Sequence, residues 1–148
     1  MKRFYVDASV FFPAAHSSRG SARELVVLAA AEQPEAQLVV SDDVIEETRR
    51  NLAYDAPEKL LVFERLVATV PFEVMTVTRR AVRAAARVVV AKDAPVVAAA
   101  KKARVDALVT YDRKYLLGKP EVAKYIRAKV ITPDEAVRLL RGKPPHRP

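Results

Sequence analysis

Residues 92–116 constrain the fold of this chain more than any other stretch. They predict a helix that begins near Pro95 and continues through alanine-rich sequence, then a short apolar strand at 107–109, then Asp112. A helix that leads directly into a short apolar strand is typical of alternating folds whose strands are parallel. In such folds helices begin where strands end, along one edge of the sheet. Asp93, at the start of the helix, and Asp112, just past the strand, are therefore expected at the same edge.

The same alternation runs through the rest of the chain. Short apolar runs predict strands at 3–6, 38–40, 72–77 and 129–131, and helical spacing predicts helices around 21–31, 41–52, 56–67 and 132–142. Residues 79–90 begin as a helix and end in three valines that fit either a helix or an extended segment, and 112–118 fit a short helix. This order predicts one domain over residues 1–142, a three-layer α/β/α sandwich with a mainly parallel central sheet. The tail, residues 143–148, is expected to be disordered.

Composition excludes several classes of site. The 148 residues contain no cysteine and two histidines, so disulfides, thiolate chemistry and a histidine-based metal centre are not expected. No apolar run approaches the length that crosses a bilayer, and a cytoplasmic location is expected. The net charge of +8 favours a polyanionic partner such as nucleic acid.

Two further acids satisfy the same positional test. Asp7 directly follows the first predicted strand, although a lone aspartate there also fits a turn or a helix cap. On the helix at 41–52, Glu47 flanks the apolar stripe and can reach back toward the sheet, whereas Glu46 lies further toward solvent. A register error of one turn would reverse that choice, and both acids could simply be solvated. Asp106 begins its strand, which places it at the opposite edge as a structural or solvated residue.

Four acids at one sheet edge predict a metal site. Carboxylates brought close together repel, and a bound cation relieves the repulsion. Magnesium prefers hard oxygen ligands and keeps several of its waters, so it requires neither histidine nor cysteine. A basic protein with an acidic pocket suits a nuclease, because lysines and arginines can bind phosphates while carboxylates bind the metal.

In their order and spacing these motifs resemble the PIN-domain ribonucleases, including toxins of the VapBC type. The resemblance is carried by YVDAS, SDDVIEETRRNL, KDAPVVAAA, LVTYDRKYL and KVITPDEAVRLL. It implies a Mg²⁺- or Mn²⁺-dependent endoribonuclease whose metal is bound by Asp7, Glu47, Asp93 and Asp112. It also implies RNA as the substrate, a homodimer and an antitoxin protein as a partner.

The resemblance extends to two supporting residues. Thr110 matches the polar residue that stands two positions before the last acid, where it can orient that acid by hydrogen bonding. Ser9 is a departure, because many members of the family carry asparagine there. A serine can still donate a hydrogen bond, so the change affects the geometry around the metal ligands rather than excluding activity.

Four arginines offer a possible RNA-binding surface, and two functions other than a ribonuclease also fit the sequence. Arg79, Arg80, Arg83 and Arg87 recur at helical intervals, and we expect either a solvated helix face or a surface that contacts RNA phosphates. A catalytically silent PIN-like module that binds RNA or protein is the main alternative. A receiver-like signalling domain is less favoured, because it needs a pair of acids after the first strand and this chain offers only Asp7.

Overall fold

The computed structural model describes residues 1–17 and 19–142, and it is built around a five-stranded sheet whose strands are all parallel. The expected disorder of residues 143–148 falls outside this described part. In chain order the elements are β1 (Lys2–Val6), α1 (Ala8–His16), α2 (Ser21–Ala29), β2 (Ala36–Ser41), α3 (Asp42–Asp55), η1 (Pro57–Lys59), α4 (Leu60–Thr69), β3 (Glu73–Met75), α5 (Arg79–Ala85), η2 (Ala91–Asp93), α6 (Ala94–Ala103), β4 (Ala107–Val109), α7 (Pro120–Ile126), β5 (Lys129–Ile131) and α8 (Pro133–Leu140).

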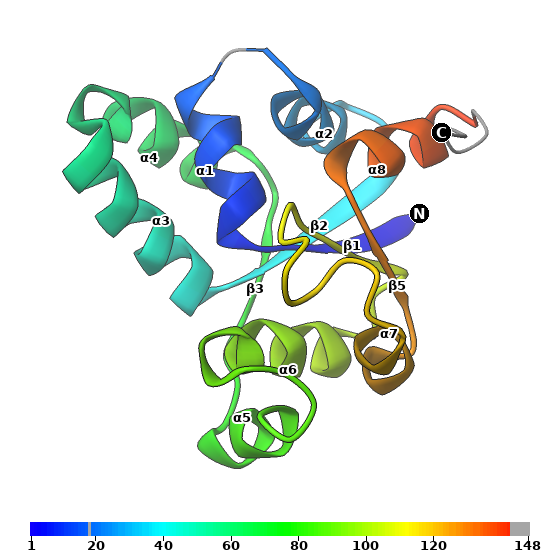
Figure 1. The fold of residues 1–148 in the computed structure, drawn as a ribbon. Helices are drawn as coiled ribbons and strands as arrows, with labels where there is room; N and C mark the ends of the chain where they lie inside the picture. Colours follow the sequence, from blue (N-terminus) through cyan, green and yellow to red (C-terminus); the bar gives the residue numbers. More distant parts are fainter. Residues whose placement is uncertain (18, 143–148) are drawn as a thin grey trace.

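The strand order is β3-β2-β1-β4-β5, with helices covering both faces. Figure 1 shows α1, α2, α3, α4 and α8 on one side of the sheet and α5, α6 and α7 on the other. The predicted α/β/α sandwich with a parallel sheet is therefore confirmed, and β3 and β5 are its edge strands. No helix in the described residues is long and apolar enough to cross a membrane.

Burial on both faces explains why the central strands are apolar throughout. Residues 4–6 of β1 and 107–109 of β4 are all buried, as expected when helices pack on both sides of a parallel sheet. One helical layer is held together partly by aromatic contacts: the ring of Phe11 in α1 meets that of Phe63 in α4 edge to face, with 5.4 Å between centroids.

Side-chain caps define where several helices begin. The Ser41 side chain accepts a hydrogen bond from the backbone of Val44 at the start of α3. Thr132 and Glu135 form a capping box at the start of α8, with Pro133 at the first helical position. These caps fix the points where the chain leaves β2 and β5 and turns back over the sheet.

The structure corrects three local expectations. Helix α1 was not predicted, because its apolar residues occur all round it and Pro13 lies inside it; α7 was not predicted either. Residues 113–118 form turns rather than the expected helix, and Gly118 has a φ of 72°. Helix α5 ends at Ala85, so the valines at 88–90 lie in a turn that leads to η2.

Ser41 provides a test of this packing, because its buried hydroxyl has two roles. It caps α3 and also accepts a hydrogen bond from the Tyr5 hydroxyl at 3.0 Å. Ser41→Ala should lose the cap, about 1 kcal/mol, and leave the Tyr5 hydroxyl buried without a partner, about 1–3 kcal/mol more. Urea unfolding should show a total loss of roughly 2–4 kcal/mol.

Thr78→Ala is the matched control, because Thr78 caps α5 through Ala81 but is exposed. It should cost only about 1 kcal/mol. Equal losses in the two variants would show that the Tyr5 contact contributes nothing to stability.

Candidate active site

The candidate site lies at the point in the sheet where the strand order reverses: strands are added on one side of β1 first, and then on its other side. Strands β1 and β4 are neighbours, with Val6 paired to Val109, while β2 and β3 lie on one side and β4 and β5 extend to the other. Ligands of open parallel sheets bind in the crevice beyond the carboxyl ends of the two strands at such a reversal. Asp7 and Thr110 are the next residues on these two strands.

Asp7 is buried and held from both sides. Its Oδ1 accepts hydrogen bonds from the backbone and hydroxyl of Ser9, and its Oδ2 accepts one of 2.7 Å from the Thr110 hydroxyl. The same side chain caps the N-terminus of α1. Asp7 is therefore both the strand-end acid and the cap that the sequence left as alternatives.

Two hydroxyls join the ends of β1 and β4. The Oγ of Ser9 accepts a hydrogen bond from the backbone of Tyr111 at 2.9 Å, and it lies 3.3 Å from the Thr110 Oγ1. Thr110 in turn accepts one from the backbone of Asp112 at 3.0 Å. The two predicted supporting residues thus connect the segments that carry Asp7 and Asp112.

Asp93 is the least satisfied acid of the site. It precedes α6, and its Oδ2 is buried without a hydrogen-bond partner, the one such side-chain oxygen or nitrogen among the described residues. Burial raises the pKa of Asp93, the charges of Asp112 and Glu47 raise it further, and Lys92 lowers it. An unpaired buried carboxylate oxygen is costly unless something binds it.

Burial also raises the pKa of Asp7 from an ordinary value of 3.8 to about 6. The hydrogen bonds from Ser9 and Thr110 stabilise the carboxylate and oppose this shift, whereas the nearby charge of Asp112 adds to it. A raised pKa at a sheet-edge crevice is characteristic of functional sites.

The structure distinguishes Glu47 from Glu46. Glu46 forms an ion pair with Arg49, which also bonds Glu64 at 2.7 Å, so it belongs to a surface network. Glu47 makes no such pair among the described residues and lies near enough to Asp93 to raise its pKa. The choice of Glu47 over Glu46 from the helical stripe agrees with this placement.

The four predicted acids interact as a chain of pairs. Charge interactions link Asp7 to Asp112, Asp112 to Asp93, and Asp93 to Glu47. Across residues 1–17 and 19–142, no three acidic or histidine side chains are close enough together to hold one metal ion. The structure therefore places the acids within electrostatic range of one another but not in the geometry of a formed metal centre.

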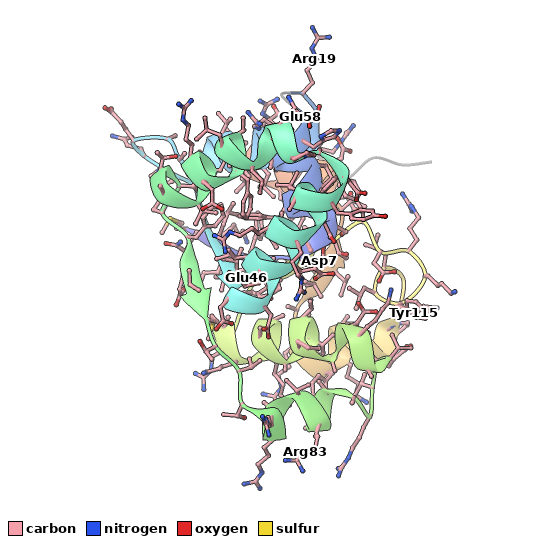
Figure 2. The ribbon with its side chains drawn as sticks, turned by 90° about the vertical axis from the view of Figure 1, so that its left-hand side faces the viewer. Asp7, Arg19, Glu46, Glu58, Arg83 and Tyr115 are labelled. Carbon is pink, nitrogen blue, oxygen red and sulfur yellow. The ribbon has the colours of Figure 1, made fainter. Side chains whose placement is uncertain are left out.

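The remaining sequence candidates lie elsewhere. The Asp106 carboxylate accepts a hydrogen bond from the backbone of Arg3 at 2.8 Å, at the edge where β1 begins, as expected for a structural role. The four candidate RNA-binding arginines are all exposed, but the fold separates them. These arginines are Arg79, Arg80, Arg83 and Arg87. Arg79 and Arg83 line a hollow with Asp43, whereas Arg80 lines a different hollow together with residues of α6 and α7. Figure 2 shows Arg83 on α5, beyond α6 from Asp7.

Sequence reasoning missed a cationic and aromatic group beside the acids. The Tyr115 ring lies 4.9 Å from the Lys92 Nζ and 5.1 Å from the Lys114 Nζ. The backbones of Lys114 and Tyr115 both donate to the Asp112 Oδ1, which ties this group to the site. The available signal was their position directly beside Asp93 and Asp112 in the sequence.

Comparison with known proteins gives a family match and a similar fold. A family model described as "PIN domain" matches residues 3–114, a span that contains all four acids. The crystal structure of PAE2754 from Pyrobaculum aerophilum has a similar fold, with a TM-score of 0.66 and 18% sequence identity over 96% of this chain and 97% of that chain. A search of curated proteins gives no significant match.

The buried Asp7 should make stability depend on pH. Its pKa of about 6 in the folded protein exceeds the ordinary 3.8, so the folded state binds more protons between these values. Stability should therefore fall as pH rises from about 4 to above 6, by about 3 kcal/mol for this group. Asp7→Asn has no charge to bury and should lack that fall.

Urea unfolding in EDTA at pH 4 and pH 8 measures the difference between the two proteins. Asp106→Asn, at an exposed acid, is the control and should follow the wild type. A constant difference between wild type and Asp7→Asn across this range would contradict the burial of a charged Asp7.

Proposed function

Because this chain belongs to the PIN-domain family, we propose that it is an endoribonuclease that uses Mg²⁺ or Mn²⁺ to hydrolyse RNA. PIN domains are usually nucleases and typically bind divalent metals, and this chain presents its acids at the sheet edge where such a site belongs. The observation that supports the proposal most strongly is the buried Oδ2 of Asp93, which has no hydrogen-bond partner. The charges of Asp112 and Glu47 also disfavour the ionised form of Asp93.

The donor set fits a hard divalent cation. It consists of carboxylates, which Mg²⁺ and Mn²⁺ prefer, and no soft ligand lies among them. A cation shared by these acids would give the Asp93 Oδ2 a partner. It would also remove the repulsion that adds to the effect of burial on the pKa of Asp7 and of Asp93. Small side-chain movements are needed, because the acids interact in pairs and do not yet converge.

In the proposed mechanism Asp7, Asp93 and Asp112 would hold the ion, and Glu47 would contribute through a water molecule. When bound, the ion would lower the pKa of a water molecule and neutralise charge on the scissile phosphate. Exposed Glu47, at the solvent side of the chain of acids, is placed to accept a proton from an attacking water.

The other residues of the site orient and bind. Ser9 and Thr110 fix the Asp7 carboxylate through its two oxygens, so that its direction does not depend on solvent. Lys92 and Lys114 can contact RNA phosphates, and a base can stack on the Tyr115 ring when an ammonium group leaves it for a phosphate. Stacking requires unpaired bases, which favours single-stranded RNA.

The biological setting is part of the same proposal. The sequence motifs resemble those of VapBC toxins, which supports a role as the toxin of a toxin–antitoxin pair in the cytoplasm, with a homodimeric form. A catalytically silent module that binds RNA is the competing function, and cleavage assays distinguish it from the nuclease.

Metal binding should stabilise the protein. At ten times the dissociation constant a bound ion contributes about 1.4 kcal/mol, which raises the melting temperature of a chain this size by roughly 3–6 °C. We expect this rise with Mg²⁺ or Mn²⁺ in the wild type and not in Asp93→Asn. If millimolar metal leaves the wild-type melting temperature unchanged, the proposed metal site is wrong.

Cleavage should depend on Glu47 and not on its neighbour. Removing groups that merely orient metal ligands costs about 10–100-fold, so Asp93→Asn should lose at least about 100-fold in cleavage of a mixed RNA pool with Mn²⁺. Glu47→Gln should also cleave much more slowly, whereas Glu46→Gln keeps wild-type activity because Glu46 pairs with Arg49.

The two glutamine variants differ by one position on the same helix, so each controls for the other. Equal activity of both variants would remove Glu47 from the mechanism. RNA binding without metal-dependent cleavage by the wild type, over many RNA targets, would favour the silent module.

A further inference from the structure

Five cationic side chains gather in a groove away from the carboxylates. They come from α5, from α6 and from the residues that cap the C-termini of α6 and α7: Arg80, Lys101, Lys102, Arg104 and Arg127. We call this the cationic groove. It has a volume of about 1040 Å³ and lies between α5, α6 and α7, which Figure 1 shows together on one face of the sheet.

The charges in the cationic groove are not neutralised by the protein. No acidic residue lines it, and none of its five cations forms an ion pair within the described residues. Lys102 donates to the backbone carbonyl of Thr76 at 2.7 Å, and the Lys101 Nζ lies 4.0 Å from the ring centroid of Tyr125, so neither contact supplies a negative charge. Like charges held together in this way repel unless an anion lies between them.

Backbone conformation singles out two of these residues. Arg104 and Arg127, with φ of 52° and 56°, are the non-glycine residues of positive φ in the described part of the chain. They end α6 and α7, where a left-handed residue is normally glycine, and any other residue costs about 1–2 kcal/mol.

A helix-capping role does not explain these arginines. Cations near a helix C-terminus are favourable, but Lys101 and Lys102 already supply them in α6, and Lys124 does so in α7. Both left-handed positions therefore carry a guanidinium where glycine would satisfy the backbone better. Both guanidinium groups border the same groove, which points to a shared ligand.

We propose that the cationic groove binds the phosphodiester backbone of an RNA strand, as an extension of the substrate site. This rests on the proposed function for the identity of the ligand. Guanidinium groups match phosphate in shape and charge, and the small side chains of Ala81, Ala84 and Ala98 leave the groove open to a backbone.

The distance from the carboxylates suits one continuous strand. Asp93 precedes α6 and Arg104 follows it, and the 10 residues of α6 span about 15 Å. A stacked strand advances about 3.4 Å per nucleotide, so about four or five nucleotides separate the two sites. RNA bound in the groove would thus place a phosphate several nucleotides away beside Asp93.

The double variant Arg104→Gly/Arg127→Gly tests the proposal without damaging the fold. Glycine relieves the left-handed strain, so the melting temperature should stay the same or rise. Binding of a fluorescent 20-nucleotide single-stranded RNA in EDTA should weaken about tenfold at 0.15 M salt. The slope of log affinity against log salt should become shallower by about 1.4, because two phosphate contacts are lost.

Two controls match this variant. Arg19→Gln/Arg65→Gln also removes two exposed charges, and neither residue lines the groove; Figure 2 shows Arg19 at the opposite end of the molecule from α5. It should leave the salt slope nearly unchanged. Arg104→Lys/Arg127→Lys retains the charge and should keep most of the slope while retaining the strain.

Three results would overturn the proposal: RNA affinity unchanged in the glycine variant, an equal loss in the Arg19/Arg65 variant, or binding of poly-glutamate as tight as that of RNA. The last would assign the groove to an acidic peptide. Because binding is measured without metal, its outcome is independent of cleavage. A wild type that never cuts RNA but binds it through these arginines would refute the nuclease and support the groove.

Discussion

The pairing of β1 with β4 is the constraint on which the site depends. It brings residues about a hundred positions apart into adjacent strands, and it makes the carboxyl ends of those strands point into one crevice. Asp7 and Thr110 meet because Val6 pairs with Val109, and the helices that start at this edge bring Asp93 and Glu47 to the same place. The side chains of the crevice then add hydrogen bonds to a geometry that the backbone has already set.

Local chemistry at this edge opposes stability. Asp7 is buried, Asp93 has an unpartnered oxygen, and like charges lie nearby, so the folded protein holds anions where their pKa values are raised. The sheet tolerates this because its central strands are apolar and buried, and because side chains cap the starts of α1, α3, α5 and α8. The cationic groove repeats the pattern with the opposite sign, since two of its three arginines occupy strained backbone positions and its cations repel one another. In both places the protein concentrates charge that a ligand could neutralise.

Positions relative to strand ends could be predicted from the sequence, because a parallel sheet aligns all its carboxyl ends. That reasoning placed Asp7, Asp93 and Asp112 at one edge and Asp106 at the other, where the structure has them. Contacts between helices could not be predicted, since they depend on packing angles that leave no periodic signal. Helix α1 has no polar face and contains Pro13, so it has no helical periodicity to detect, and the left-handed conformation of Arg104 has no sequence signal because such positions usually carry glycine.

The order of the strands also has a consequence for synthesis of the protein. The central strand β1 is made first, yet its partner β4 and the hydroxyl that binds Asp7 follow more than a hundred residues later. At about 5–20 residues per second a ribosome needs roughly 5–20 s to cover that distance. During this interval the nascent chain carries Asp7 and Glu47 but lacks Asp112. If the protein cleaves RNA, the nascent chain would thus be unable to cleave the mRNA being translated until almost all of the domain has been synthesised.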